Sequence, residues 1–426
     1  MWRRGNWREN FGQRFGKYDC HFKQSITNRH MIWLHAVSVG EVGLCTQLIR
    51  ALEPRLPNVK IVVSTTTTTG MGELQKKLPS RIGKIYYPVD RALYVNRALN
   101  VVHPEAIVLT EAEIWPNFLW RARSLGIPIF LVNARLSDKS FRGYKKFAFL
   151  FRPLFASFAG VGVQNEADAE RLRAVGCRPE AIQIVGNLKF DAAKLDEKQP
   201  LNTAGLLKQL AVPAGAKIIV AGSTHAGEEA LLAGQFLRLR TRFPDLFLVI
   251  VPRHFERARQ VGRELADCGV KFVYRSEILT KTRFAPGEMD CLLVNTTGEL
   301  KYFYEHATVV FVGKSLTAEG GQNPIEPGAL GRAMVFGPHM QNFKDIARAL
   351  VKQEGAVQIQ NAQELERVLG ELLADEPRRV RLGHNARQVV RNNEGAVGRT
   401  VEMIMEHLKD GDLYVKPTDT AKKTAG

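Results

Sequence analysis

Cysteine is scarce in this sequence, with five residues among 426, and no two of them form a C-x-x-C pair. This scarcity excludes a zinc ribbon and a disulfide framework, and it favours a reducing compartment. No apolar run approaches the roughly 18 residues that cross a bilayer, and the start of the chain does not resemble a signal peptide. We therefore expect a cytoplasmic or peripheral protein.

Motifs for metals and nucleotide phosphates are also missing. No Walker loop or Gly-x-Gly-x-x-Gly follows a predicted strand, and no His and Cys residues have the spacing of zinc ligands. The one Asp-x-Asp pair, Asp410 and Asp412, lies in the C-terminal tail, far from any predicted strand. The sequence predicts chemistry without a metal or a bound cofactor.

Acidic residues are too few to balance the basic ones, since 60 Lys and Arg stand against 43 Asp and Glu, a net charge of +17. Such a charge implies an anionic partner: nucleic acid, a membrane surface or a phosphorylated substrate. Residues 1–30 combine basic and aromatic side chains, which suits an anionic lipid surface or a helix packed on its own domain. The aromatic residues of this stretch are Trp2, Trp7, Phe11, Phe15 and Phe22.

The length exceeds what one hydrophobic core supports, so two domains of roughly 200 residues are expected. From Met31 short apolar runs alternate with longer amphipathic ones, which is typical of βαβ units and a parallel sheet. A polar, Pro-containing connection at 191–216 interrupts the alternation, which then restarts. The predicted strands are 31–37, 60–64, 105–110, 127–132, 160–164, 182–185, 217–221, 246–251, 271–275, 290–295, 308–313 and 333–336.

This pattern predicts an α/β protein with two Rossmann-like domains that face each other across a cleft. Among enzymes that transfer sugars this architecture is the GT-B glycosyltransferase fold. The expected domains are 1–195 and 205–410. Residues 411–426 are expected to form a disordered tail.

Charged residues follow the predicted strands of the first domain. Ser38-x-x-Glu41 is a capping-box pattern at a helix start, yet a strand, a glycine turn and a helix also present reactive groups in open sheets. The helix dipole favours an ionised Glu41 in either case. Glu111 and Glu113 follow one strand and Arg135 the next. These carboxylates are suited to acid–base work or to ordering a cation, or they keep the strand end solvated and paired with arginines.

Three loops of the second domain offer groups for an anion. Ser223 and Thr224 follow a strand and precede a helix, where backbone amides and hydroxyls suit a phosphate or simply cap the helix. Arg253 follows the next strand and can grip a phosphate through two bonds or cap a loop carbonyl. The loop 319–326 has two glycines and ends with Glu326, a carboxylate that suits ribose hydroxyls or caps its own helix. Three such loops on one sheet favour a nucleotide site.

Eight motifs, in order, resemble those of the 3-deoxy-D-manno-octulosonic acid (Kdo) transferase family of lipopolysaccharide synthesis, over roughly residues 10–400. They are HAVSVGE, TEAEIWPN, NARLS, GNLKFD, GST-H-x-GEE, VPRH, TGEL and GGQNPIEP. The resemblance implies a GT-B fold, CMP-Kdo as donor co-substrate, a lipid A precursor of the lipid IV-A type as acceptor, and inversion at the anomeric carbon. It also implies work at the cytoplasmic face of the inner membrane, with the first domain binding the acceptor and the second binding CMP-Kdo.

Motif positions carry the family's residue roles onto this chain. The resemblance implies that Glu41 is the general base and that Glu111 and Lys189 support the transition state. The residues that it implies for CMP are Ser223, Thr224, Pro252, Arg253, Gly298, Glu299, Leu300, Asn323, Pro324, Ile325 and Glu326. Members of this family usually begin with an apolar anchor, whereas this chain begins with a basic aromatic stretch. We therefore expect peripheral attachment, or an anchor that this chain lacks.

Two other functions stay open. Another nucleotide-sugar enzyme of the same fold, such as an epimerase, is the first, because a fold does not fix a function. The second is a basic protein that binds nucleic acid or a membrane. Loops rich in glycines and carboxylates are not suited to binding the phosphate backbone of a nucleic acid, so we expect no nucleic-acid partner.

Overall fold

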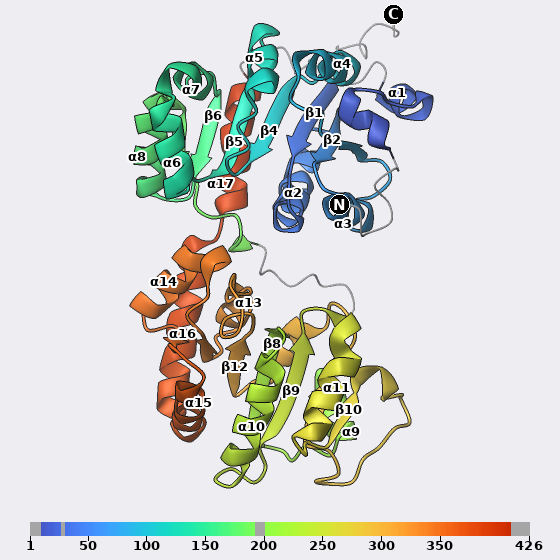
Figure 1. The fold of residues 1–426 in the computed structure, drawn as a ribbon, viewed down its shortest axis with the longest axis vertical. Coiled ribbons are helices and arrows are strands. Elements are labelled where there is room, and N and C mark those ends of the chain that lie inside the picture. Colours follow the sequence, from blue (N-terminus) through green and yellow to red (C-terminus); the bar gives the residue numbers. More distant parts are fainter. Residues whose placement is uncertain (1–9, 27–29, 192–200, 410–426) are drawn as a thin grey trace, which may run out of the picture. The chain divides into compact units, whose positions relative to one another are not determined.

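The computed structural model describes residues 10–26, 30–191 and 201–409. The chain divides into two compact units, one formed by Met1–Ala192 with Glu394–Gly426 and the other by Ala193–Asn393. Within the described residues each unit is built on a seven-stranded sheet in which every strand pair is parallel (Figure 1). The predicted disordered tail, 411–426, lies outside the described residues.

The first sheet has the strand order β3-β2-β1-β4-β5-β6-β7. Alternate residues of β1 serve the two faces: Ile32 and Leu34 pack with helices α2 and α17, and Met31 and Trp33 pack with α4, α5 and α7. Because both faces are covered, the strands are mainly apolar. The strands are β1 (His30–His35), β2 (Val59–Thr65), β3 (Gly83–Tyr86), β4 (Ala106–Thr110), β5 (Ile129–Ala134), β6 (Gly160–Val163) and β7 (Ile182–Ile184). The helices are α1 (Cys20–Ile26), α2 (Val39–Leu52), α3 (Thr68–Lys77), α4 (Ala92–Val102), α5 (Pro116–Ser124), α6 (Asp138–Lys146), α7 (Ala148–Phe155), α8 (Glu166–Val175) and α17 (Ala396–Lys409).

The second sheet has the strand order β10-β11-β9-β8-β12-β13-β14. Helices α10, α11 and α15 cover one face through a cluster that includes Phe236, Val261 and Leu369. The strands are β8 (Ile218–Thr224), β9 (Phe247–Pro252), β10 (Phe272–Tyr274), β11 (Cys291–Leu293), β12 (Val309–Val312), β13 (Met334–Phe336) and β14 (Val357–Gln358). The helices are α9 (Thr203–Gln209), α10 (Glu228–Arg240), α11 (Ala258–Asp267), α12 (Leu300–Tyr304), α13 (Ile325–Ala329), α14 (Lys344–Lys352), α15 (Gln363–Ala374) and α16 (Glu376–Asn393).

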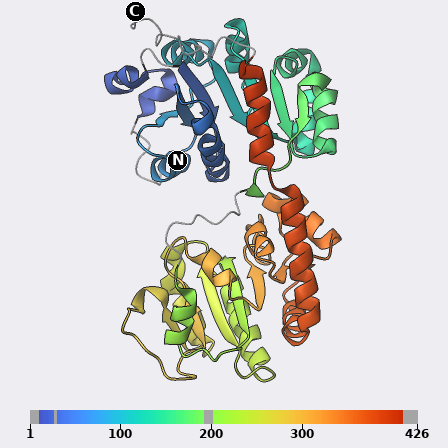
Figure 2. The ribbon, with the colours of Figure 1, turned by 180° about the vertical axis from the view of Figure 1, so that it is seen from behind.

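The chain returns to the first unit at its C-terminal end. Helix α17 buries Val401, Ile404 and Leu408 in the cluster that α2 also joins, and both ribbon views show it against the first sheet (Figures 1 and 2). The Asp191 carboxylate accepts the backbone N–H groups of residues 395 and 397 at 2.7 and 2.6 Å, which fixes the start of this helix. The second domain predicted at 205–410 therefore extends too far, because an amphipathic pattern reveals an apolar face but not the sheet that covers it.

Each sheet has a point at which the strand order reverses. Strand β1 pairs with β2 on one side and β4 on the other, and β8 likewise pairs with β9 and β12. Ligands of open α/β sheets bind at the carboxyl ends of the strands at such a point. The loops that follow β1 and β4, and those that follow β8 and β12, are therefore the places to search.

The described part of the basic N-terminal stretch packs on its own unit. Phe22 is buried, Phe15 meets Tyr94 edge to face at 5.1 Å, and the Arg14 guanidinium lies 4.2 Å from the ring centre of Tyr86. For residues 10–26 this supports packing within the domain over contact with lipid, whereas Trp2 and Trp7 lie outside the described residues. In the described ranges no helix is both long and apolar enough to span a membrane.

Candidate active site

Glu41 is both a helix cap and a buried carboxylate at the β1–β4 reversal. It is 8% exposed and forms a complete capping box with Ser38, whose hydroxyl lies 2.7 Å from Oε1. The backbone N–H of Val37 donates to Oε2 at 3.0 Å, and the Thr110 hydroxyl lies 3.0 Å from the same oxygen. The two interpretations of this motif are thus compatible, since the cap itself places the carboxylate at the strand ends.

His35, the first residue of the same motif, is a structural residue. It is fully buried, its Nδ1 lies 2.9 Å from Ser64 Oγ, and its ring stacks on Tyr87 with centroids 3.9 Å apart. Burial lowers the pKa of His35 to about 3. The imidazole is therefore neutral and inaccessible, which leaves Glu41 as the base candidate of this loop.

Glu111 follows β4 in the left-handed backbone region, with φ of 56°, a conformation that non-glycine residues adopt rarely and often at functional sites. Burial raises the pKa of its carboxyl, the charges of Arg135 and Lys189 oppose that rise, and Glu41 adds to it. The structure therefore brings two further predicted catalytic residues, Glu41 and Lys189, within electrostatic reach of Glu111, together with Arg135.

A hydrogen-bonded turn after β7 holds Lys189. Its backbone N–H donates to Asn187 Oδ1 at 3.0 Å, and Asn187 Nδ2 donates to Gln164 Oε1 at 2.8 Å. The buried Asn133, which also has a positive φ, accepts the Leu188 N–H at 3.2 Å. The ends of β5 and β6 therefore fix the direction in which the Lys189 turn leaves the sheet.

Glu113 is the third carboxylate of this site and lies with Glu111 in the loop after β4. Its Oε2 accepts the indole N–H of Trp115 at 2.8 Å. Burial raises the pKa of Glu113 to about 7, the Trp115 hydrogen bond opposes this, and the charges of Glu41 and Glu111 add to it. Close to neutral pH this carboxyl is divided between its two protonation states.

The raised pKa of Glu113 predicts a stability effect that depends on pH. A carboxyl whose folded pKa exceeds its unfolded value of 4.5 favours folding only while protonated, so stability is lost as the pH rises from about 4.5 through 7. Glu113→Gln stays neutral and keeps an acceptor for Trp115. We expect the variant to be more stable than the parent by about 1–3 kcal/mol at pH 8, allowing for its partial exposure. Urea unfolding at pH 4 and pH 8 measures this, and an equal difference at both pH values contradicts it.

In the second unit the loop after β12 meets the loop after β9. Asn323 Nδ2 donates to Glu326 Oε1 at 3.1 Å. Burial raises the pKa of Glu326, while that hydrogen bond and the charges of Lys301 and Arg253 oppose the rise. The exposed Arg253 donates its backbone N–H to Thr224 O at 3.0 Å. Arg253 of VPRH and Lys301, the residue after TGEL, are therefore within electrostatic reach of Glu326 of GGQNPIEP.

Close packing at the end of β8 requires a glycine. A Cβ on Gly222 would lie 1.9 Å from the Tyr304 hydroxyl and 3.0 Å from Leu300 Cδ1, so α12 approaches the strand directly. In the turn before α12, Gly298 has φ of 84°, and the Glu299 carboxylate accepts the Thr296 hydroxyl at 2.6 Å and pairs with Arg275. The TGEL segment is thus fixed beside the start of the Gly-Ser-Thr loop.

Not every predicted CMP residue presents its side chain to a ligand. Thr224 is fully buried and its hydroxyl donates to Glu229 Oε1 at 3.0 Å, so its predicted phosphate contact is not supported. Ser223 is partly exposed and has φ of 54°. The side chains of three further residues are buried, which leaves their backbones as the available contacts: Pro252, Pro324 and Ile325.

Three residues of these sites are missing from the sequence prediction. Thr110 is the first residue of TEAEIWPN and Lys301 follows TGEL, but the pattern gives no reason to aim the first at Glu41 or the second at Glu326. Glu228 is fully buried and accepts the backbone N–H groups of residues 225, 314, 315 and 316, which joins the loops after β8 and β12. These partners lie up to 88 residues away in the sequence, so a linear motif does not reveal the structural role of Glu228. Across the described ranges no group of three or more His, Cys, Asp or Glu could hold a metal ion.

Comparison with known proteins identifies the family. The family model described as 3-deoxy-D-manno-octulosonic-acid transferase matches residues 9–192. The 3-deoxy-D-manno-octulosonic acid transferase of Haemophilus influenzae is 31% identical over 406 residues, which are 95% of this chain and 92% of that protein. The chain belongs to the Kdo transferase family. This assignment confirms the resemblance inferred from the eight motifs.

The fold of this Kdo transferase family member is shared with enzymes of two kinds. A glycosyltransferase from Rickettsia africae is 13% identical with a TM-score of 0.57, over 90% of this chain and all of that one. A UDP-GlcNAc 2-epimerase from Neisseria meningitidis is 13% identical with a TM-score of 0.58, over 89% of this chain and all of that one. The predicted GT-B fold is confirmed. The fold alone would leave transferase and epimerase undecided, and it is family membership that identifies a glycosyltransferase.

Proposed function

We propose that this glycosyltransferase moves Kdo from CMP-Kdo to a lipid A precursor of the lipid IV-A type, with inversion at the anomeric carbon. Membership of the Kdo transferase family supports the transferred sugar. The observation that carries the mechanism is the enclosed Glu41 carboxylate at the β1–β4 reversal, beside Glu111 and Lys189.

In the proposed reaction Glu41 accepts the proton of the acceptor's primary hydroxyl as that oxygen attacks the anomeric carbon of Kdo. The bond from this carbon to the CMP phosphate oxygen breaks, and its electron pair leaves with CMP. Attack from the face opposite the leaving group inverts the centre. The charge that develops is met by Lys189, and Glu111 fixes the position of that ammonium through their mutual attraction.

The hydrogen bonds of Glu41 explain how a capping carboxylate stays available as a base. Four donor contacts reach its two oxygens, as many as a carboxylate accepts. The Thr110 hydroxyl, however, has a single hydrogen and lies within bonding distance of both His35 O, at 2.8 Å, and Oε2 of Glu41, at 3.0 Å. When that hydrogen is given to His35 O, Oε2 regains a lone pair for the substrate proton without leaving a buried donor unsatisfied.

We assign CMP to the edge of the second sheet where the loops after β8, β9 and β12 meet. Arg253 provides a guanidinium for phosphate, and Glu326 provides a carboxylate for ribose hydroxyls. We also assign to CMP the residues Gly298, Glu299 and Leu300 and the backbone of the segment from Asn323 to Ile325. The hydroxyl of Ser223 is assigned to the phosphate. The first unit, in this proposal, takes the acceptor.

We propose that transfer needs no metal ion, because the lysine and arginine side chains supply the positive charge that an anionic leaving group requires. Transfer that continues at full rate in EDTA is the expected result. The lipid nature of the acceptor and the net charge of +17 favour work at the cytoplasmic face of the inner membrane.

Incubation of the purified protein with CMP-Kdo and a lipid A precursor tests the function. Mass spectrometry should show the acceptor heavier by one or more Kdo residues, with CMP released in equal amount, and NMR of the product should show an inverted anomeric centre. A parallel incubation with UDP-GlcNAc should show no turnover. Epimerisation of the UDP-sugar without any release of CMP from CMP-Kdo would favour the epimerase alternative.

A further inference from the structure

Lys314 lies two residues past the end of β12, the strand that pairs with β8 at the reversal of the second sheet (Figure 1). Its backbone has φ of 52°, a left-handed conformation that non-glycine residues adopt rarely and often at functional sites. The buried Glu228 carboxylate accepts the Lys314 N–H at 2.7 Å, and Lys314 O accepts the Gly321 N–H at 2.9 Å. The loop 314–321 is therefore closed, and these two bonds hold Lys314 in its left-handed conformation.

The side chain of Lys314 lies against Gly320 in this closed loop. A Cβ on Gly320 would lie 3.3 Å from Lys314 Nζ, 3.6 Å from its Cε and 2.9 Å from Asn342 Nδ2. The backbone of Gly320, with φ of 122°, donates to Gln341 Oε1 at 2.7 Å and accepts the Asn342 N–H at 2.8 Å. Because these bonds fix Gly320, the absence of a side chain there is what gives the Lys314 ammonium its room.

The ammonium of Lys314 is a half-buried cation that no acidic side chain neutralises. Among the described residues it has neither an ion pair nor a hydrogen-bond partner. Arg257 and Arg275 of the same unit, by contrast, pair with Glu229 and Glu299. A partly desolvated charge without a counter-ion gains most from an anion that binds beside it. Lys314 therefore offers a place for an anionic group that the protein itself does not supply.

The donor of the proposed reaction carries two anionic groups, a phosphate and the carboxylate of the octulosonic acid. Arg253, assigned to the phosphate, follows β9, and β8 separates β9 from β12. Since neighbouring strands are about 4.8 Å apart, Arg253 and Lys314 leave the sheet roughly 10 Å from each other. The cations that act on Glu326, assigned to the ribose, are Lys301 and Arg253. The position of Lys314 thus favours the carboxylate.

We propose that Lys314 binds the carboxylate of the Kdo residue in the donor and so selects an acidic sugar. The three N–H groups of an ammonium form charge-assisted hydrogen bonds with a carboxylate. A neutral sugar on a nucleotide lacks this anion and gains nothing from Lys314. The assignment rests on the proposed function, because it takes CMP-Kdo as the donor.

Calorimetric titration of the full chain with CMP-Kdo, its C1 methyl ester and CMP tests this contact. The ester keeps the nucleotide and the sugar but has no carboxylate charge. The parent should bind CMP-Kdo about 10- to 100-fold more tightly than the ester, the range for one hydrogen-bonded charge. In Lys314→Gly and in Lys314→Met this ratio should fall to about one, while the affinity for CMP stays within about twofold.

Two comparisons separate this effect from a change in structure. Glycine adopts a positive φ without strain, so Lys314→Gly should unfold at a urea concentration no lower than the parent. Lys217→Met is the matched control, because Lys217 is also half-buried and precedes β8 at the opposite edge of the sheet, where its ammonium lies 4.4 Å from the ring centre of Phe243. This control should keep the parent's ratio between CMP-Kdo and the ester.

An unchanged ratio in folded Lys314→Gly overturns the assignment, as does an equal fall in Lys217→Met. Equal losses for CMP and CMP-Kdo also overturn it, because Lys314 then acts on the phosphate. Failure of the proposed function appears in the parent: a parent that does not bind CMP-Kdo removes that function and this contact together. A parent that prefers CMP-Kdo to the ester, with variants that keep the preference, removes the contact alone.

Discussion

Glu41→Gln is expected to lower the rate of Kdo transfer by roughly 10²- to 10⁴-fold, the contribution of a general base. Glutamine has nearly the shape of glutamate but cannot accept the acceptor's hydroxyl proton. Binding of CMP should be unchanged, because no predicted CMP residue lies on β1 or α2. Single-turnover rates and calorimetric CMP binding measure the two effects separately.

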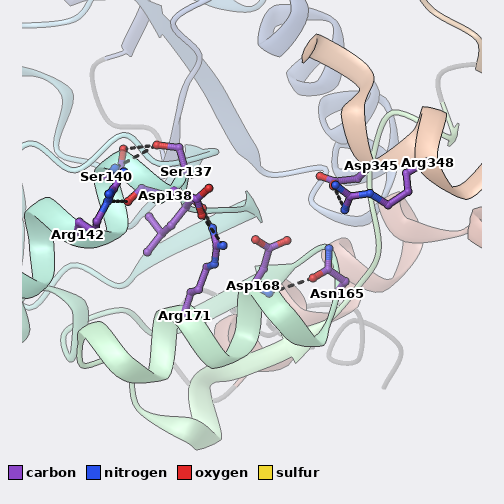
Figure 3. Close-up of polar contacts among 10 residues, drawn as sticks. Ser137, Asp138, Ser140, Arg142, Asn165, Asp168, Arg171, Asp345 and Arg348 are labelled. Carbon is purple, nitrogen blue, oxygen red and sulfur yellow. Dashed lines mark hydrogen bonds and ion pairs between the residues drawn. The ribbon is translucent and has the colours of Figure 1, made fainter. Parts of the chain in front are cut away.

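The same substitution also has a structural effect, which a control must separate. The amide nitrogen of the introduced glutamine cannot accept the N–H and O–H groups that now reach the carboxylate, so we expect a loss of about 1–3 kcal/mol in unfolding free energy. Asn165→Ala removes another helix cap of the first unit, the bond from the Asp168 N–H at 3.0 Å (Figure 3). It should lower stability by about 1 kcal/mol and leave transfer intact. If Glu41→Gln behaves like this control, Glu41 is only a cap and the proposed base must be abandoned.

The dual character of Glu41 shows what a sequence pattern can and cannot decide. Ser38-x-x-Glu41 predicts the capping box, which the structure confirms. The pattern contains no information on Thr110, which reaches Glu41 only because β4 pairs with β1. Strand pairing converts separate motifs into a site, and pairing is decided by the whole sheet rather than by any local window.

The limits of prediction elsewhere in the fold have the same origin. Fully buried strands such as β4 and β12 are evident in the sequence as apolar runs, whereas β3 and β14 are not. The first of these has four residues, of which two are buried, and the second has two half-buried residues. The segment 138–155 forms two helices, α6 and α7, with Phe147 in a non-helical conformation between them, a break that the local pattern of residues does not reveal. The packing of α17 on the first unit likewise depends on how the helix fits the first sheet and α2, which the sequence of α17 alone does not reveal.

Lys189→Met is the second substitution for which we expect a large effect. It keeps the apolar stem and removes the charge, so the developing negative charge of the leaving group loses a preorganised partner. Loss of one such group typically costs roughly 10²- to 10³-fold in kcat. The KM for CMP-Kdo should change little if Lys189 acts mainly in the transition state. Steady-state kinetics with both substrates varied distinguish these parameters.

The charge of Lys189 has a further consequence that a purely structural role does not produce. It opposes the effect of burial on Glu111, so its removal should raise the pKa of Glu111 further. The acid limb of the pH–rate profile should then move to higher pH in Lys189→Met, and Lys189→Arg should restore part of the rate and of the profile. Lys60→Met is the matched control, because Lys60 lies at the amino end of β2, on the opposite edge of the sheet, and donates to Ser25 O at 2.9 Å. Equal rates and unshifted profiles in Lys189→Met and Lys60→Met would remove Lys189 from the mechanism and leave the neutralisation of the leaving group to Arg253.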